Sequence, residues 1–170
     1  MSVLFLPDGS PDWPRLVPVL IVSACIGALS TAYTAQYAFD LEPCILCLYQ
    51  RIPYALAGVI ALAAIMMPRG VLRYVLVVLC VPVFLVSAGI AFYHVGVEQH
   101  WWTSAAGCGG SIPDVMSAAD LQLGLLDTPQ KSCDQLDWTL FGLSMATYNV
   151  VASLALAVAT MVGSRRMGGR

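Results

Sequence analysis

The sequence predicts an all-α fold, a bundle of four transmembrane helices. Hydrophobic residues make up 59% of the 170 residues and charged residues only 11%, whereas an ordinary soluble domain has about 45–50% apolar and about 25% charged residues. Four apolar segments also match the roughly 20 residues that cross a hydrocarbon core about 30 Å thick. They cover residues 16–35, 48–67, 74–93 and 140–162. We therefore expect a lipid bilayer around this chain, and no nucleic-acid partner.

The first segment, residues 16–35, holds no charged residue and is interpreted as a helix that stays in the chain. A cleaved signal peptide is the alternative, but its apolar region would span only about 7–15 residues and would follow basic residues. Residues 1–13 contain neither Lys nor Arg. A transmembrane helix is therefore the better prediction for this segment.

The second segment, residues 48–67, contains a single charged residue, Arg51, close to its start. A charge at or inside the bilayer is costly, so such an arginine marks a functional site by default. The alternative is an interface residue whose long side chain reaches back to water. The third and fourth segments, residues 74–93 and 140–162, contain no charged residue.

The basic residues predict how the bundle is oriented. With four spans, six of the eight fall on one side: Arg15, Arg69, Arg73, Arg165, Arg166 and Arg170. Only Arg51 and Lys131 remain on the other side. Lys and Arg in short loops mark the cytoplasmic face, so both termini are expected in the cytoplasm. Two loops, residues 36–47 and 94–139, then face outward, and the chain forms one integral membrane domain over residues 1–170.

Apolar residues recur at helical spacing inside the second outer loop. They are Ile112, Val115, Met116, Ala119, Leu123 and Leu126. This spacing predicts a short amphipathic helix that lies in the outer membrane interface. A helix packed against the end of the bundle is the alternative.

The six cysteines are sorted by their place relative to the four segments. Cys25 and Cys80 lie among apolar residues inside the first and third segments, so we expect them to act as small hydrophobic side chains. The other four lie in the outer loops or at the mouth of the second segment: Cys44, Cys47, Cys108 and Cys133. Thiols in an oxidising outer compartment tend to pair, and these four form an even set.

Cys44 and Cys47 are separated by only two residues. A disulfide across so short a loop constrains the unfolded chain little, whereas a close Cys-x-x-Cys pair is the usual dithiol of redox chemistry. A helix that begins near Cys47 would place that sulfur beside the positive end of the helix dipole, with Arg51 one turn later on the same face. The spacing favours a redox pair. Structural disulfides and a zinc site with four thiolate ligands stay open.

Three stretches of the sequence resemble one known family. The most specific is PCILCLYQRIPY at residues 43–54; the second is YHVGVE at residues 93–98, and the third is CDQLDW at residues 133–138, which leads into FGLSM at residues 141–145. Together with four spans, they resemble the disulfide-bond formation protein B (DsbB) family, the quinone-linked membrane oxidases of bacterial periplasmic thiol proteins. The resemblance extends over nearly the whole chain.

The resemblance implies a role for each candidate residue. Cys44 and Cys47 match the pair next to the quinone, and Cys47 matches the one that contacts its ring. Arg51 matches an arginine that holds the quinone and activates that cysteine. His94 falls where a quinone-site histidine is proposed, although a solvated interface residue is the alternative for this histidine.

Cys108 and Cys133 match the loop pair of that family, which exchanges with the soluble oxidase. Cys108 would form the mixed disulfide, and Cys133 would then communicate with Cys44 through a transient bond between the loops. The segment Gly107–Gly110 around Cys108 is unusually rich in glycine compared with the family. The catalytic residues are thus expected to be Cys44, Cys47, Cys108 and Cys133.

The resemblance also implies the cofactor, the partner and the compartment. The enzyme would be a quinone-dependent protein-disulfide oxidoreductase that uses ubiquinone or menaquinone. It would oxidise the dithiol of a periplasmic DsbA-like, thioredoxin-fold donor from the bacterial inner membrane, with its redox loops facing the periplasm.

Three other functions stay open from the sequence. One is a vitamin K epoxide reductase-like enzyme, which performs similar chemistry with another arrangement of cysteines. Another is a metal- or haem-binding membrane protein that uses the cysteines or His94 and His100, although no histidine pair lies within the helices. The third is a purely structural four-helix protein with two static disulfides.

Overall fold

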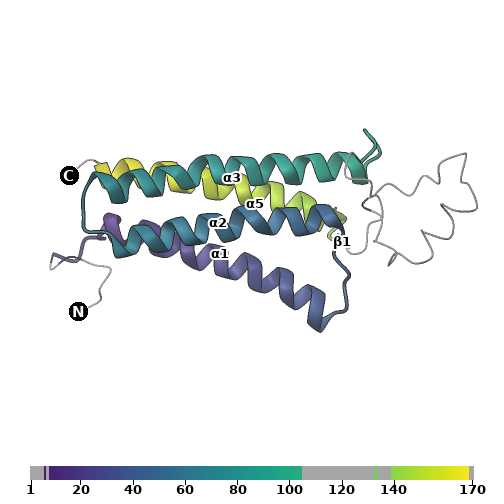
Figure 1. Cartoon of the computed structure of the whole chain (residues 1–170), viewed down its shortest axis with the longest axis horizontal. Helices are drawn as coiled ribbons and strands as arrows, with labels where there is room; N and C mark the ends of the chain where they lie inside the picture. The colour runs from purple at the N-terminus through teal and green to yellow at the C-terminus, as the bar shows by residue number, and fades with distance from the viewer. Residues whose placement is uncertain (1–5, 7, 105–132, 134–138, 169–170) are drawn as a thin grey trace, which may run out of the picture.

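The computed structural model describes residues 6, 8–104, 133 and 139–168. Four long helices run along the bundle (Figure 1): α1 (Trp13–Ala38), α2 (Ile45–Met66), α3 (Val71–Glu98) and α5 (Met145–Gly168). Each is long and apolar enough to cross a membrane. The all-α fold with four transmembrane helices is therefore confirmed, and the chain is a multi-pass membrane protein.

The helices are arranged so that α1 begins and α5 ends at the same end of the bundle (Figure 1). The helix α3 packs most extensively on α5 and α2, and α1 rests mainly on α2. Toward residue 38, α1 diverges from α2, and an extended segment crosses back to the start of α2 (Figure 1). The divergence separates α1 from the rest of the bundle at the end where Cys44 lies.

Small residues allow the helices to approach one another closely. On α2, Ala57, Ala61 and Ala64 are fully buried at helical spacing. A Cβ atom added to Gly163 of α5 would come within 2.9 Å of the Val17 side chain on α1. Because lipid tails are as apolar as the side chains, close packing of this kind is a main source of helix association in a membrane.

The helix limits differ from the sequence prediction by up to six residues, and three of these differences bear on the site. The helix α2 begins at Ile45 rather than at residue 48, and α3 continues to Glu98 rather than ending at residue 93. The helix α5 begins at Met145, because residues 139–144 form a short hairpin instead of its first turn. At 28 residues, α3 is about 42 Å long at 1.5 Å per residue, which exceeds the hydrocarbon core of about 30 Å.

The hairpin before α5 joins β1 (Thr139–Leu140) to β2 (Leu143–Ser144). Phe141 and Gly142 in its turn both have positive φ, 50° and 77°, as a two-residue type I′ turn requires. The Ser144 hydroxyl then accepts a hydrogen bond from the Thr147 backbone N–H at 3.2 Å, which caps α5. The expected interfacial helix at residues 112–126 lies outside the described residues.

Arg73, one of the basic residues used to predict orientation, closes the opposite end of the bundle. Its guanidinium group is buried and donates hydrogen bonds to the carbonyls of Met67, Ile65 and Pro14. These acceptors include the last carbonyls of α2, which have no partner within their own helix. Arg73 thus ties the starts of α1 and α3 to the end of α2.

Candidate redox site

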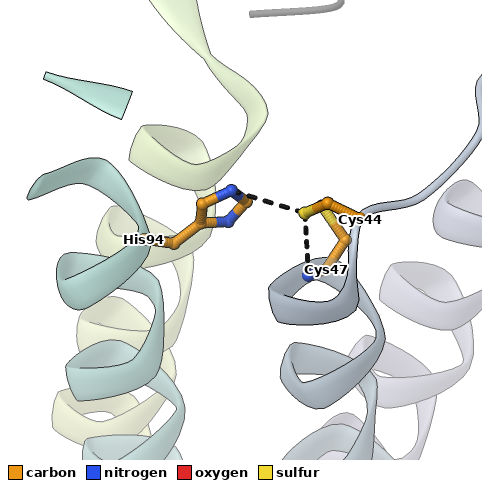
Figure 2. A group of neighbouring side chains, drawn as sticks. All are labelled: Cys44, Cys47 and His94. Carbon is orange, nitrogen blue, oxygen red and sulfur yellow. Dashed lines mark hydrogen bonds between the residues drawn. The ribbon is translucent and has the colours of Figure 1, made fainter. Parts of the chain in front are cut away.

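Cys44 and Cys47 sit at the first turn of α2. Cys44 is the N-cap residue, and its sulfur accepts a hydrogen bond from the Cys47 backbone N–H at 3.3 Å. The two sulfur atoms lie 2.8 Å apart, and both cysteines are free thiols. Because α2 starts at Ile45, the helix amide stabilises the Cys44 sulfur (Figure 2). The helix expected to begin near Cys47 begins at Ile45, so Cys47 lies in its first turn, and the described amide contact is made to the Cys44 sulfur.

His94 of α3 faces this pair across the helix interface (Figure 2). Its Nε2 atom lies 3.5 Å from the Cys44 sulfur and 3.7 Å from Oε1 of Glu98, one turn further along α3. A backbone group of Cys133 also accepts a hydrogen bond from the His94 ring. With 4% of its surface exposed, His94 is a buried residue, which removes the alternative of a solvated interface histidine.

The surroundings of Cys44 favour its thiolate form. Its pKa is lowered to about 4, chiefly because the Cys47 thiol donates a hydrogen bond to its sulfur, and further because His94 does so; burial acts in the opposite direction. A thiolate at neutral pH is the form that attacks disulfides and gives up electrons. The described geometry therefore activates the first cysteine of the pair.

This activation can be tested through the pH dependence of alkylation. In the reduced protein we expect iodoacetamide to modify Cys44 at a constant rate from pH 8 down to about 5, and more slowly as the pH falls through about 4, where the thiolate becomes protonated. An ordinary thiol, with a pKa of about 8.5, would lose reactivity tenfold per pH unit below that value. Mass spectrometry of the Cys44 peptide measures the rate.

The same experiment on His94→Ala should give a higher midpoint, because one hydrogen-bond donor to the thiolate is lost. Cys80→Ala is the matched control, since Cys80 lies in the separate core of the bundle. A midpoint near 8 for Cys44 in the unmodified protein would contradict the account.

Arg51 is held by α1 rather than extended into water. Its Nη1 atom donates a hydrogen bond to Oε1 of Gln36 at 2.7 Å, and its guanidinium carbon lies 4.8 Å from the centre of the Tyr33 ring. Its Nε atom is buried and has no hydrogen-bond partner within the part of the chain that the structure describes. A buried N–H without a partner is costly, so Arg51 has a donor available for a molecule that is not part of the chain.

A cavity of about 500 Å³ lies between these side chains. Its walls come from all four helices and from the segment before α2, and the lining is mostly apolar. The sequence-predicted residues Cys44, Cys47, Arg51 and His94 all line it, together with Glu98. Sites for small molecules typically enclose about 300–1,000 Å³ with a few polar groups among apolar walls. The structure thus brings four of the sequence-predicted residues to the wall of one cavity.

The sequence analysis missed a chain of polar side chains that reaches His94 from the bundle interior. Gln50 contacts Nδ1 of His94, Asn149 of α5 contacts Gln50, and Tyr54 contacts Asn149. Two of these residues lie within the stretch at residues 43–54 that carries the family resemblance, and Asn149 is a polar residue in a mostly apolar segment. Polar residues within a membrane span mark functional sites, and this signal was available for Asn149.

Cys133 lies next to the first pair. It is buried and packs in one cluster with Cys44, Leu46 and Val97, and it is disulfide-bonded. Cys108 lies outside the described residues. Cys25 and Cys80 are buried in the other cluster, within the bundle, as expected for small hydrophobic side chains.

The site has some of the features of a metal centre. The ligand atoms of Cys44, Cys47 and His94 all lie within 4.8 Å of one another. Structural zinc sites use four protein ligands, and catalytic ones use three plus an open position. Only the second kind could be assembled from these three side chains, so the expected alternative of a zinc site with four thiolates has no support among the described residues.

Comparison with known proteins gives a consistent result. Residues 14–163 match the family model for the disulfide bond formation protein DsbB. The chain is 34% identical over 153 residues to the disulfide bond formation protein B of Xanthomonas campestris, which covers 86% of this chain and 88% of the relative. It is 32% identical over 138 residues to that of Methylobacillus flagellatus, covering 79% and 83%. An uncharacterised protein of Rickettsia prowazekii is 30% identical over 149 residues, covering 86% of each chain.

Proposed function

The chain belongs to the DsbB family of membrane disulfide bond formation proteins, and on that premise we propose that it oxidises a DsbA-like periplasmic thiol protein and passes the electrons to a membrane quinone. The observation that carries the proposal is the cavity of about 500 Å³, which Cys44, Cys47, Arg51 and His94 line together. Family membership favours this function over a vitamin K epoxide reductase-like enzyme. The free thiols of Cys44 and Cys47 argue against two static disulfides.

The residues present fit a quinone head group. The cavity has the size of a small-molecule site. No acceptor among residues 6, 8–104, 133 and 139–168 reaches the buried Arg51 Nε–H, and a carbonyl oxygen would supply one. Arg51, His94 and Cys47 are the residues that would hold it. When bound, ubiquinone or menaquinone would take up two electrons and two protons to give the quinol.

The protein's own part of this reaction is the oxidation of Cys44 and Cys47. Because Cys44 is already a thiolate, the pair loses two electrons and the single proton of the Cys47 thiol as the S–S bond forms. His94 and Glu98 line the same cavity, where they can receive and hold this proton. The lowered pKa of Cys44 keeps one proton off its sulfur at neutral pH. The site thus begins the reaction with a thiolate already present.

The second cysteine pair links the cavity to the soluble partner. Among the described residues, four cysteines are free thiols and Cys133 is disulfide-bonded, so we propose Cys108, the remaining cysteine of the sequence, as its partner. A partner thiolate would attack Cys108, release the Cys133 thiolate, and leave oxidised after its second thiol attacks the mixed disulfide. Cys133 would then attack Cys44 of the Cys44–Cys47 disulfide and release the Cys47 thiolate. Cys108 would attack Cys133 in turn, which restores the Cys108–Cys133 disulfide and releases the Cys44 thiolate. The burial of Cys133 and Cys44 in one cluster supports this exchange.

Such a partner is difficult to oxidise. A DsbA-type dithiol has a reduction potential of about −120 mV, whereas structural disulfides lie below about −300 mV. Since about 30 mV corresponds to ~1.4 kcal/mol for two electrons, an ordinary disulfide would oxidise it uphill by roughly 8 kcal/mol. Either the two pairs are unusually oxidising or the quinone draws the reaction forward.

The orientation of the bundle follows from its basic residues. The start of α1 and the end of α5 lie at the same end of the bundle (Figure 1), where Arg15, Arg69 and Arg165 also lie in the sequence pattern. The positive-inside tendency then gives cytoplasmic termini. The cavity and Cys133 would face the periplasm from the bacterial inner membrane.

Cys108 should be the site that the partner attacks first. Glycines on both sides of Cys108 give an incoming chain room to approach. A DsbA-like partner without its second active-site cysteine should therefore displace the Cys133 thiolate and stay bound to Cys108, as an adduct on a non-reducing gel whose disulfide is located by mass spectrometry. A partner bound to Cys133 instead would reverse the order.

A further inference from the structure

A chain of hydrogen bonds crosses the bundle from α5 to the redox cysteines. The Tyr54 hydroxyl donates to Oδ1 of Asn149 at 2.6 Å, and Nδ2 of Asn149 donates to Oε1 of Gln50 at 2.5 Å. Nε2 of Gln50 lies 2.8 Å from Nδ1 of His94. The last link is His94 Nε2, 3.5 Å from the Cys44 sulfur. The first two links run from donor to acceptor toward His94, and the direction of the last two depends on which ring nitrogen carries the proton.

The direction of this chain decides where the His94 ring carries its proton. Because the Gln50 amide nitrogen faces Nδ1, Nδ1 must be the bare nitrogen that accepts. The proton of a neutral ring then resides on Nε2, which faces the Cys44 sulfur and the Glu98 carboxylate. Both groups accept hydrogen bonds, so they too favour a proton on Nε2.

The contact with His94 does not by itself fix the orientation of the Gln50 amide, because this group can rotate by half a turn. Rotation would bring its NH₂ group against the NH₂ group of Asn149, and neither could accept. Asn149 is held in turn by two hydroxyl groups at its oxygen, from Tyr54 at 2.6 Å and Ser153 at 3.3 Å. The two amides therefore keep a common direction, and reversing one requires reversing the other.

We infer that Asn149, acting through Gln50, is a positioning residue that fixes the proton of a neutral His94 ring on Nε2, where it is donated to the Cys44 sulfur. The inference deepens the proposed function and rests on it for its purpose. Gln50 and Tyr54 are buried, with 7% and 5% of their surface exposed. Polar groups held inside a membrane bundle are costly unless they are paired or have a function.

The test uses two substitutions that each replace one NH₂ group by an oxygen. In Asn149→Asp, the new carboxylate can only accept, so the Gln50 amide should turn its NH₂ group toward it and its oxygen toward His94. In Gln50→Glu, a carboxylate oxygen faces Nδ1 directly. In both variants Nδ1 must then carry a proton. Gln50→Glu also keeps the test decisive if Asn149→Asp fails to fold.

The position of the proton can be read by ¹⁵N NMR of histidine-labelled protein in detergent. The sequence holds only two histidines, so a His100→Asn background leaves His94 as the single signal; asparagine tolerates the positive φ of 58° at that position. Spectra are recorded with Cys44 and Cys47 reduced, and at pH 8, well above an ordinary carboxyl pKa of about 4. Ser164→Ala is the matched control, because it removes a buried polar group of α5 that does not belong to the chain of hydrogen bonds to His94.

We expect the unsubstituted ring and Ser164→Ala to give one protonated nitrogen, Nε2, and one bare nitrogen, Nδ1. In both carboxylate variants, the ¹⁵N chemical shift of Nδ1 should move from the range of an unprotonated ring nitrogen to that of a protonated one. A proton on Nδ1 before substitution, whether in a neutral or a charged ring, would overturn the inference. So would an unchanged Nδ1 resonance in folded Asn149→Asp. No quinone or partner is present, so failure here would leave the proposed electron transfer standing.

Discussion

Cys47→Ser is expected to abolish the reduction of quinone by a reduced thiol partner, and Cys44→Ser is expected to do the same. Both sulfurs line the cavity and lie 2.8 Å apart, and with either one missing no disulfide can form between them. The two electrons of the partner then have no route to the quinone. Absorbance of a soluble quinone analogue, followed with purified protein and excess reduced partner, measures the loss.

Cys25→Ala and Cys80→Ala are the matched controls for this experiment. Both cysteines are buried in the bundle core, away from the cavity lining, so we expect nearly unchanged turnover. Each truncation should lower the stability of the fold by about 1 kcal/mol, as core substitutions usually do. Full turnover by purified Cys47→Ser would show that the electron route is assigned to the wrong residues.

Arg51→Gln is expected to weaken the use of quinone by about 10–100-fold. The buried Nε–H of Arg51 lacks an acceptor within the described residues, and a hydrogen bond from a charged group contributes about 1.5–3 kcal/mol. Arg51→Lys keeps the charge but loses the planar group of donors, so its effect should be intermediate. The quinone KM and kcat of the two variants give the measurement.

Arg69→Gln provides a control for charge at a membrane boundary. Arg69 pairs with Asp12 at the opposite end of the bundle, so its removal should leave the quinone KM unchanged. If Arg51→Gln also kept the KM and kcat of the unsubstituted protein, Arg51 would be an interface anchor. The contacts with Gln36 and Tyr33 would then have only a structural role.

The sequence predicted the four helices because their evidence is local. Runs of apolar residues such as 74–93 contain all the information that membrane insertion requires. Helix ends depend instead on capping contacts that hydropathy does not register. Because Cys44 caps α2, this helix begins earlier in the sequence than predicted. Because Ser144 caps α5 after the hairpin, that helix begins later than predicted.

The sequence predicted only the part of the candidate site whose evidence is local. Cys44, Cys47 and Arg51 lie within one stretch of sequence, and their spacing alone indicates redox chemistry. The contacts made by Gln36 and Asn149 come from other helices and depend on how each helix is rotated about its axis. Spacing along one helix cannot predict that rotation, and it also attributed the amide contact to Cys47 instead of Cys44.

The proposed function requires that electrons leave the thiols of this protein for a quinone. It is tested most directly by counting the free thiols of purified, fully reduced protein before and after anaerobic addition of a soluble ubiquinone or menaquinone analogue. We expect one disulfide to form, and two thiols to be lost, for each quinol released, with Cys44–Cys47 formed first, and we expect no thiol to be lost without quinone. Loss of thiols at the same rate without quinone, or thiols that persist in its presence, would contradict it.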